Sequence, residues 1–551
     1  MSSGMLTNIA AHLPAMARRQ PDTPAIHIPT GKGQKYKTFS FKQLDRESDR
    51  IAHGLEEIGI GRGVHTALMV TPGLEFFALT FALFKVGAVP IMIDPGIGIK
   101  NLKICLAEAE PEAFVGIPKA HVARLLFGWG KPTLKTLLTV GGKLFWGGST
   151  LRGIKRKAPA DKPYRVVETE SGETAAILFT SGSTGVPKGV VYTHGNFIAQ
   201  VEQLKAVYDI QPGEIDLPTF PLFALFAPAL GMSSVVPVMD FTRPGSVDPK
   251  NIIDPIKKFN ITTMFGSPAL INRVGRYGEE NGIKLPSLKR AISAGAPVPA
   301  SVLERFTKML GEGVEVFTPY GATESLPVCS IGSREILQDT RKATDNGFGV
   351  CVGMPVPGIK LEIISTTDEP IDWWNDDLKV PANEIGEIVV SGAQVTRRYF
   401  NRKKSTDLAK ILDPPNATFY HRMGDLGYRD NYGRIWFCGR KAHRVTCTDK
   451  TLYTIPCEAI FNTHPKVFRS ALVGVGKPGN MKPVICIELE PGIDKNEHAQ
   501  IIRELKLLTQ KHELIQPIGH ILIHPAFPVD IRHNAKIFRE KLAVWAKGQI
   551  R

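Results

Sequence analysis

The chain has few cysteines for its length, seven among 551 residues. They are scattered, odd in number and never form a Cys-x-x-Cys pair. This distribution excludes a disulfide framework and offers no zinc-binding pattern, so we interpret the cysteines as reduced thiols of a cytoplasmic protein. Hydrophobic residues make up 43% and charged residues 22% of the chain, values close to the average that indicate neither disorder nor a fibrous architecture.

No apolar run is long enough to span a membrane. The two best candidates fail for different reasons, because 76–93 contains Lys85 and 222–232 is too short. The amino terminus has no basic region ahead of an apolar block, so we expect no signal peptide. We therefore expect a cytoplasmic protein, with any contact to a membrane being peripheral.

Acidic residues are missing from 113–160, although the whole chain contains 53 of them. Lys and Arg residues alternate there with Leu, Phe and Trp. The basic positions are Lys119, Arg124, Lys131, Lys135, Lys143, Arg152, Lys155, Arg156 and Lys157. Such a segment is suited to resting on lipid or docking a protein partner. Glycine pairs at 141–142 and 147–148 interrupt any long amphipathic helix, and they fit a solvated loop with a few buried anchors equally well.

The length of the chain is too great for one hydrophobic core, so we expect at least two domains. Helical spacing over 6–19 and 41–58 alternates with short apolar strands that end in turn residues, which is typical of an α/β fold. The expected strands are 64–70, 89–93, 174–180, 262–264, 288–293 and 314–318. In such sheets, loops at the carboxyl ends of the strands bind ligands.

After Gly349 the pattern changes to short β runs, including 360–364 and 386–391. Beyond a strand that ends at Arg440, short strands and a helix at 495–514 form a set of about domain size. We predict an α/β fold in two parts. Residues 1–438 form a large N-terminal domain of layered α/β sheets with a β-rich subdomain, and residues 439–551 form a small, mobile C-terminal α+β domain.

The most informative stretch is 177–197, where a loop rich in Gly, Ser and Thr joins two apolar strands. Its glycines let backbone N–H groups approach an anion, its hydroxyl groups add donors, and Lys188 adds a positive charge. The loop is not a Walker A motif, because Pro187 precedes the lysine and Gly189 follows it. An ordinary Ser/Gly hairpin turn is the alternative. The candidate phosphate-binding residues are Thr180, Ser181, Gly182, Ser183, Thr184, Gly185 and Lys188.

This spacing resembles the signature of the adenylate-forming superfamily, which includes acyl-CoA synthetases, luciferases and peptide-synthetase adenylation domains. Residues 317–325 resemble its second adenylation motif. The resemblance implies that Tyr320, next to Gly321, stacks on adenine, that Thr323 contacts the α-phosphate, and that Glu324 holds Mg²⁺. Read alone, the segment also fits a strand followed by an N-capped helix.

Three further segments resemble motifs of the superfamily. Residues 291–297 resemble a turn whose backbone frames the adenine. The segment around Asp425 resembles Tyr-Arg-Thr-Gly-Asp, so its carboxylate would accept hydrogen bonds from both ribose hydroxyls, although an acid there could also cap a turn. Arg440 matches the hinge arginine, which reaches ribose or phosphate. The residues of the adenine turn are Ala294, Gly295 and Ala296.

The segment 528–537 resembles the family's terminal Pro-x-x-x-x-Gly-Lys-Ile loop, with Ala535 in place of glycine. The resemblance implies that Lys536 enters the site with the small domain and neutralises charge that develops on the α-phosphate. ATP and Mg²⁺ are then required, and the implied catalytic residues are Lys188, Thr323, Glu324 and Lys536. A non-catalytic nucleotide-binding or scaffold protein is the alternative from another class, but it would have no reason to keep these residues together.

Two departures from the acyl-CoA synthetase pattern argue against CoA as second substrate. Ala442 holds a position where the family has Asp or Lys, and the loop after it lacks a glycine whose backbone conformation thioester formation needs. The segment 217–231 resembles the acyl-site motif Pro-Leu-Phe-His, but Ala224 replaces the histidine and widens an apolar pocket for a long aliphatic chain. A stripe of Phe and Leu also fits plain core. The pocket residues are Phe220, Phe223, Ala224 and Phe226.

These departures, together with 113–160, resemble the β-lactone synthetases of bacterial long-chain olefin biosynthesis. The resemblance implies a long-chain 2-alkyl-3-hydroxy acid whose own β-hydroxyl attacks the adenylated carbonyl and expels AMP. His194 and His443 are weak candidates for the group that takes the hydroxyl proton. The alternative is a long-chain fatty acyl-CoA synthetase or fatty acyl-AMP ligase. A net charge of +15 favours phosphate groups in general; we expect pathway proteins or a membrane surface at 113–160, and no nucleic acid.

Overall fold

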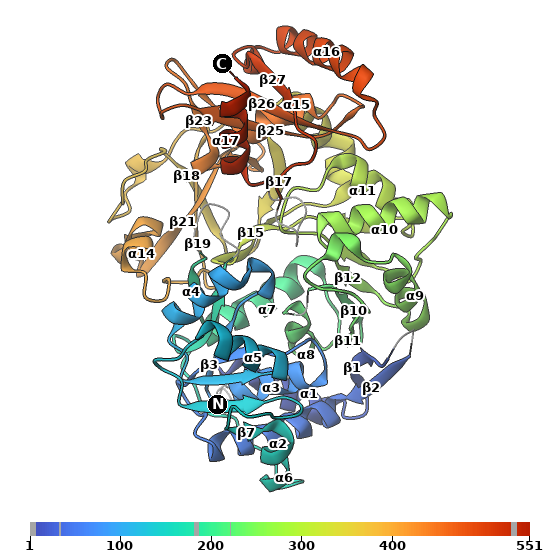
Figure 1. Cartoon of the computed structure of the whole chain (residues 1–551), viewed down its shortest axis with the longest axis vertical. Coiled ribbons are helices and arrows are strands. Elements are labelled where there is room, and N and C mark those ends of the chain that lie inside the picture. The colour runs from blue at the N-terminus through green and yellow to red at the C-terminus, as the bar shows by residue number, and fades with distance from the viewer. Residues whose placement is uncertain (1–6, 32–34, 181–186, 221, 530–536, 551) are drawn as a thin grey trace.

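The structure is a computed structural model that describes residues 7–31, 35–180, 187–220, 222–529 and 537–550. In Figure 1 the N-terminal elements fill the lower part of the molecule and the C-terminal elements lie at the top. Within the described ranges, no helix combines the length and apolarity needed to cross a membrane.

The first large sheet has the strand order β7-β6-β5-β3-β4-β8-β9. Its neighbours pair in parallel except for the antiparallel hairpin β8–β9. The phosphate loop joins these two hairpin strands. The strands are β3 (His65–Met69), β4 (Val89–Met92), β5 (Ala113–Gly116), β6 (Thr136–Thr139), β7 (Ser149–Thr150), β8 (Thr174–Phe179) and β9 (Gly189–Thr193).

The second large sheet has the order β14-β13-β12-β10-β11-β1-β2 and is parallel except for β2. Parallel neighbours require crossover connections, which helices supply. The strands are β1 (Pro24–Pro29), β2 (Tyr36–Ser40), β10 (Ile215–Pro218), β11 (Ser233–Val235), β12 (Thr263–Phe265), β13 (Arg290–Ile292) and β14 (Glu315–Phe317).

Helices α2 (Phe41–Glu57), α3 (Leu74–Lys85) and α7 (His194–Tyr208) share one core with residues of both sheets. Every residue of α3 from Phe76 onward is buried, as expected for a helix that is apolar on all sides. Lys85 is the charged exception, and its Nζ lies 2.6 Å from carboxylate oxygens of both Asp45 and Asp49. The two carboxylates compensate a charge that could not otherwise be buried.

The outer faces of the two sheets carry further helices. Alternate residues of β3, β4 and β5 pack against α4 (Ile99–Ala109) and α5 (Pro118–Phe127), since successive strand residues point to opposite faces. On the second sheet the outer layer consists of α9 (Lys250–Phe259), α10 (Pro268–Glu280) and α11 (Ala300–Thr307). These layers confirm the predicted α/β architecture.

The basic segment 113–160 is part of this architecture. It contains β5, α5, β6, β7 and α6 (Leu151–Lys157). The interpretation as a solvated loop is therefore wrong for the segment as a whole, and it fits only the connection 140–148, where Trp146 is a buried anchor. Glycines at 128 and 141 have positive φ, so they end elements and form turns within the segment.

A third, antiparallel sheet follows, with the order β15-β16-β17-β22-β21-β19-β18 and β20 paired to β21. It is the predicted β-rich subdomain. Its strands are β15 (Tyr320–Ala322), β16 (Ser325–Ser330), β17 (Val350–Pro355), β18 (Lys360–Ile364), β19 (Gly386–Ser391), β20 (Lys410–Asp413), β21 (Thr418–Arg429) and β22 (Ile435–Arg440).

The C-terminal elements have cores of their own. Strands β25 (Val467–Val475), β26 (Lys482–Leu489) and β27 (His520–Ile523) form a mixed sheet. Three helices pack with it: α15 (Thr454–Phe461), α16 (His498–Lys511) and α17 (Arg539–Gln549). The helix expected at 495–514 is α16 with a short 3₁₀ turn at each end. The domain division at residue 438 and the mobility of the small domain stay predictions.

Candidate active site

The neck of the phosphate loop lies at the end of the β8–β9 hairpin. The Thr180 N–H donates to the carbonyl oxygen of Lys188 at 3.0 Å, and the Lys188 N–H donates back to Thr180 Oγ1 at 3.2 Å. These bonds fix where the loop leaves and re-enters the sheet. The predicted contacts of the loop itself lie outside the described residues, and they concern Ser181, Gly182, Ser183, Thr184 and Gly185.

The ammonium group of Lys188 lies over an aromatic ring. Its Nζ is 4.9 Å from the centre of the Tyr399 ring, within the range of a cation–π contact. Burial lowers the pKa of Lys188; the charge of Glu324 opposes this change, and those of Arg402 and Arg440 add to it. A cation that has lost part of its water is well suited to an incoming phosphate, because the attraction is less screened.

Glu324 is held by its side chain and by its backbone. Its Oε1 accepts a hydrogen bond from the Tyr399 hydroxyl at 2.6 Å. Its carbonyl oxygen accepts from Thr396 N–H at 2.9 Å and from Thr396 Oγ1 at 3.1 Å. The preceding residue is fixed in the same way, since the Tyr192 hydroxyl donates to the Thr323 carbonyl oxygen at 2.5 Å. Tyr399 thus joins the predicted metal ligand to the predicted phosphate-binding lysine.

Asp425 is the centre of a second group. It is buried on β21, directly opposite Arg440 on β22. Its Oδ1 accepts from Arg440 Nη1 at 2.8 Å, and its Oδ2 accepts from the Tyr320 hydroxyl at 2.7 Å. Burial and the Asp425 charge raise the pKa of Tyr320, and the same carboxylate raises the pKa of Arg440. The structure therefore brings together three residues that lie in separate sequence motifs.

The predicted adenine turn follows strand β13. The Ser293 N–H donates to the Phe317 carbonyl oxygen at 2.9 Å, which joins this turn to the motif that contains Tyr320. Gly295 has φ of +102°, a conformation that side chains rarely allow. Ala294 and Ala296 are half-buried beside it. Gly321 packs so closely that a Cβ there would lie 2.6 Å from the Ser325 carbonyl oxygen.

Residues 396–402 form a segment that the sequence interpretation missed. Besides carrying Thr396 and Tyr399, this segment pairs with β9, where the Phe400 N–H donates to the Gly189 carbonyl oxygen at 2.7 Å. Arg402 donates to Glu108 Oε2 from Nε at 2.9 Å and from Nη2 at 2.6 Å, which fastens the segment to α4. The only signal in the sequence was an aromatic pair between basic residues, Arg398-Tyr-Phe-Asn-Arg402.

Lys410 is a second residue that sequence reasoning did not identify. It is buried on β20, and its Nζ donates to the carbonyl oxygen of Thr396, the residue that binds Glu324. Burial lowers the pKa of Lys410 to about 7, against the opposing effect of the Glu324 charge. His421 pairs with Lys410 across β20 and β21, and burial followed by the Lys410 charge lowers the pKa of this histidine. A lysine directly before the apolar pair Ile411-Leu412 was the available signal.

The two histidines predicted as proton acceptors have different surroundings. His194 lies in the core, where its Nδ1 accepts from the Ile9 N–H at 3.2 Å. Burial lowers the pKa of His194 to about 4, and this contact favours a structural role. His443 lies 3.3 Å from Glu540 Oε1 on α17, and burial lowers the pKa of this histidine as well. Both rings are neutral near pH 7.

Of the predicted acyl-site residues, Phe223, Ala224 and Phe226 lie in a short helical turn, η3 (Phe223–Phe226), and Phe220 precedes it. Phe223 packs edge-on against Phe220 at 5.3 Å and against Phe265 at 4.5 Å. Phe226 contacts Phe197 on α7 at 6.0 Å. Ala224 is buried in the core shared by the two large sheets. The predicted widening of an acyl pocket by this alanine stays a prediction.

Hydrogen bonds fix the residues next to the hinge and the two ends of the terminal loop. After Arg440, Lys441 Nζ lies 3.0 Å from Glu387 Oε2, so Ala442 follows directly on an anchored residue. Gly439 has φ of +123°, and a Cβ there would lie 2.2 Å from Thr454 Oγ1. The terminal loop begins and ends where the Phe538 N–H donates to the Pro528 carbonyl oxygen at 2.8 Å. Lys536, inside this loop, lies outside the described residues.

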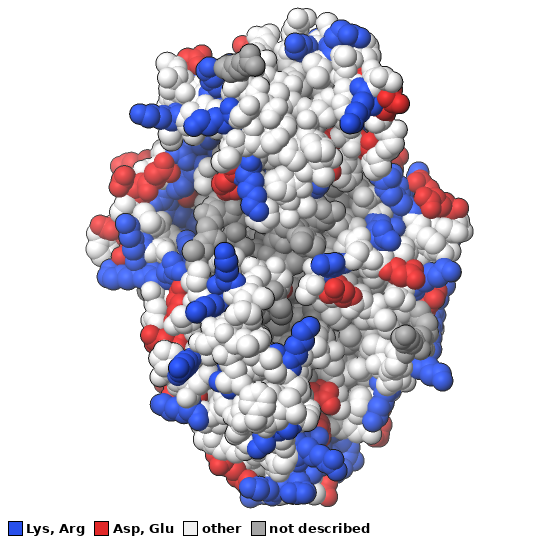
Figure 2. Space-filling model, in the orientation of Figure 1, with Lys and Arg blue, Asp and Glu red and all other residues white. Residues whose placement is uncertain are grey.

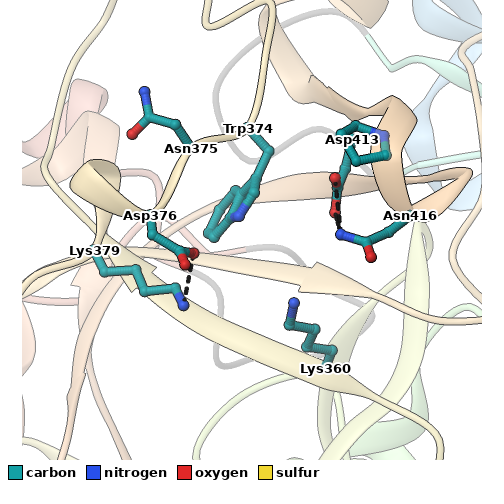
Figure 3. A pocket seen from close by; sticks show the side chains of 8 residues that line it. Lys360, Trp374, Asn375, Asp376, Lys379, Asp413 and Asn416 are labelled. Atoms are coloured by element: carbon teal, nitrogen blue, oxygen red, sulfur yellow. Dashed lines mark hydrogen bonds and ion pairs between the residues drawn. The ribbon is translucent and has the colours of Figure 1, made fainter.

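A separate hollow of about 330 Å³ opens on the β-rich subdomain. Figure 3 shows Trp374 and two lysines around it. Trp374 stacks on Tyr420 at 3.9 Å, and Lys379 is paired with Asp376 at 2.9 Å. Tyr420 and His421 are adjacent on β21, so their side chains point to opposite faces of the sheet. None of the residues that line the hollow belongs to the group around Asp425.

Comparisons with known proteins agree with this arrangement. The model of the AMP-binding enzyme family matches residues 13–400. An olefin beta-lactone synthetase of Xanthomonas campestris pv. campestris is 49% identical over 99% of this chain and 98% of its own length. One of Stenotrophomonas maltophilia is 48% identical over 98% of both chains. The structure of the amide bond synthetase McbA from Marinactinospora thermotolerans has a TM-score of 0.80 at 20% identity, covering 98% of this chain and 100% of that one.

Proposed function

Because this chain belongs to the AMP-binding enzyme family of ATP-dependent, AMP-forming ligases, we propose that it converts a long-chain 2-alkyl-3-hydroxy acid into a β-lactone for olefin biosynthesis. The carrying observation is the 49% identity with an olefin beta-lactone synthetase along nearly the whole of both chains. The groups around Glu324 and Asp425 support the first step, and the residue at the hinge supports the second.

In the first step, a carboxylate oxygen of the acid attacks the α-phosphorus of ATP, and the bond to pyrophosphate breaks. Asp425 holds the ribose. To accept hydrogen bonds from the ribose hydroxyls, its carboxylate gives up the hydrogen bond from Tyr320 or the one from Arg440. Lys188 and Lys536 neutralise the charge that grows on the phosphate oxygens. Tyr320 then keeps its ring against the adenine. The products are an acyl-adenylate and pyrophosphate.

Mg²⁺ would be held by Glu324. The residue fits this role. The Tyr399 hydroxyl donates to Oε1 only, and no described residue donates a hydrogen bond to Oε2. A carboxylate oxygen is a ligand that Mg²⁺ prefers, and this ion commonly takes its other ligands from phosphates and water. The ion, when bound, offsets the negative charge of the phosphates.

In the second step, the β-hydroxyl oxygen of the same molecule attacks the adenylated carbonyl carbon. A new C–O bond closes the four-membered ring, the bond to AMP breaks, and the hydroxyl proton is released. Nucleophile and carbonyl are held in one molecule, so no second encounter is needed. Ala442 and the loop without glycine support this route. Both depart from the pattern that serves thioester formation with CoA, and the intramolecular attack needs no CoA thiol.

The test is mass spectrometry of products from ATP, Mg²⁺ and a long-chain 2-alkyl-3-hydroxy acid, with and without CoA. We expect AMP, pyrophosphate and a product lighter than the acid by one water, in equal yield without CoA. A long-chain fatty acid that lacks the hydroxyl should stop at the adenylate. If CoA accelerates AMP release and an acyl-CoA forms, the chain is a long-chain fatty acyl-CoA synthetase and the lactone proposal is wrong.

We also propose that the protein attaches to another surface in the cell through the basic segment 113–160. The basic segment 113–160 supports a contact with either a membrane surface or pathway proteins, since its elements α5 and β6 to α6 carry Lys and Arg without any acid. A long-chain substrate and product have low solubility in water, which gives such a contact a purpose. The protein would then be cytoplasmic and attached peripherally.

A further inference from the structure

Exposed apolar side chains are concentrated in one part of the molecule. Half of the large apolar residues that stand exposed in the described ranges lie between residues 99 and 145. Leu126 is 74% exposed and Phe145 is 82% exposed, so these two project fully into solvent. The whole set is Ile99, Ile104, Val122, Leu125, Leu126, Phe127, Leu144 and Phe145. A set of this size on one surface marks an interaction site.

These side chains belong to one face, which we call the attachment face: the exposed sides of α4 and α5 and the loop 140–148. Both helices cover the same side of the first large sheet, packing their inner residues into one core cluster. The loop is tied to α5, because the His121 and Trp146 rings stack at 5.1 Å with an angle of 7° between their planes. Trp146 also donates to Thr139 Oγ1 at 2.9 Å. Leu144 and Phe145 therefore stand beside α5 on a fixed support.

The charge around this face is predominantly positive, although α4 carries Glu108 and is followed by the exposed Glu110. Its exposed or half-buried lysines are Lys100, Lys103, Lys119, Lys131 and Lys143. No acid occurs from 113 to 160. In Figure 2 the surface over α5 is largely uncharged, and Lys and Arg side chains surround it. Two other basic residues of the segment are already paired, since Lys135 binds Glu112 and Lys155 binds Glu47.

We infer that the attachment face binds an anionic lipid surface. This inference deepens the attachment part of the proposed function and is independent of the lactone step. Protruding Leu and Phe side chains enter the boundary between headgroups and acyl chains, while the lysines around them bind lipid phosphates. Charge complementarity favours lipid as the occupant, because a membrane supplies negative charge on every side of the inserted residues.

The experiment is co-sedimentation of the full chain with vesicles of phosphatidylcholine, alone or mixed with phosphatidylglycerol. We expect binding to the mixed vesicles that falls with rising salt. The variant Leu126→Glu/Phe145→Glu should weaken vesicle binding by about tenfold or more. The matched control is Leu507→Glu/Val544→Glu, which adds the same charge at exposed apolar residues of α16 and α17 and should bind like the wild type.

A second measurement separates this inference from the proposed chemistry. Adenylation of a short, soluble hydroxy acid should be unchanged in Leu126→Glu/Phe145→Glu, since neither residue belongs to the candidate active site. Absence of binding to mixed vesicles, or an equal loss in the control variant, would overturn the lipid inference and leave the reaction proposal untouched. Vesicle binding that stays at the wild-type level in Leu126→Glu/Phe145→Glu would also overturn the inference. If the same variant loses binding to a protein partner, the attachment face is a protein-binding surface.

Discussion

Tyr399 donates a hydrogen bond of 2.6 Å to Oε1 of Glu324. The same side chain presents its ring to the ammonium group of Lys188 at 4.9 Å. A single tyrosine thus orients the candidate metal ligand and contacts the candidate phosphate-binding lysine. Among the described residues, none donates a hydrogen bond to the other carboxylate oxygen of Glu324.

The first prediction concerns this hydrogen bond. Tyr399→Phe keeps the ring under Lys188 but removes the donor to Glu324. We expect a higher half-saturating Mg²⁺ concentration and a loss of about 1.5–3 kcal/mol in kcat/KM, the range for a hydrogen bond to a charged group. ATP–pyrophosphate exchange measured over a Mg²⁺ titration checks this. Tyr428→Phe is the control, because that hydroxyl donates to the Phe348 carbonyl oxygen instead; an equal effect there would contradict the prediction.

The second prediction concerns Asp425. Asp425→Ala should weaken ATP binding by about 1–3 kcal/mol, because ribose hydroxyls lose a charged acceptor. Calorimetric titration with ATP checks it. Asp413→Ala removes another buried carboxylate, one that bonds to Asn416 on the side of the separate hollow, and should leave affinity unchanged. An unaltered dissociation constant in Asp425→Ala would remove this residue from the site.

The third prediction concerns Lys536. Lys536→Ala should abolish adenylation and leave ATP affinity nearly unchanged, because the lysine acts on charge that develops in the transition state. Single-turnover formation of the adenylate and equilibrium ATP binding are measured on the same preparation. Lys547→Ala, at an exposed lysine on α17, serves as control. Parallel losses of affinity and turnover would show ground-state binding instead.

The fourth prediction concerns pH. The pKa of Lys410 is lowered from 10.5 to about 7 by burial, so between these values the unfolded chain binds the proton and the folded chain does not. The free energy of unfolding therefore rises with pH in this window, by up to about 1.4 kcal/mol per pH unit.

The variant Lys410→Met has no titrating group at this position, so it lacks the pH-dependent contribution of Lys410 to the free energy of unfolding. Urea unfolding of both proteins from pH 7 to pH 9 should show the wild type gaining stability relative to the variant as pH increases. Equal pH slopes for the two proteins would mean that Lys410 keeps its proton in the folded state throughout this range.

The sequence predicted the layered fold because its strands are short, apolar and followed by turn residues. It also predicted which motifs meet, since Tyr320, Asp425 and Arg440 each lie in a segment that resembles a motif of the adenylate-forming superfamily. Tyr399 and Lys410 escaped prediction because their roles depend on tertiary position. The pairing of residues 396–402 with β9 brings Tyr399 next to Glu324, and the pairing of β20 with β21 places Lys410 against the Thr396 carbonyl oxygen.

The basic segment shows a different reason for failure. The glycine pairs at 141–142 and 147–148 do lie in a loop, but this loop is short and joins β6 to β7 of the first sheet, so the segment as a whole is not a loop. His194 shows a third reason. A histidine in a family position suggested chemistry, whereas its ring nitrogen accepts a hydrogen bond from the Ile9 backbone, a partner 185 residues away in sequence.

The bonds between Arg402 and Glu108 connect α4 of the attachment face with the segment that carries Tyr399. This ion pair offers a physical route by which a displacement of α4 on binding lipid would reach the segment beside Glu324. Thermodynamic linkage requires the influence to run both ways and to be equal in size. If a membrane strengthens nucleotide binding by some factor, nucleotide strengthens membrane binding by that same factor, and the enzyme would leave the bilayer when ATP is depleted.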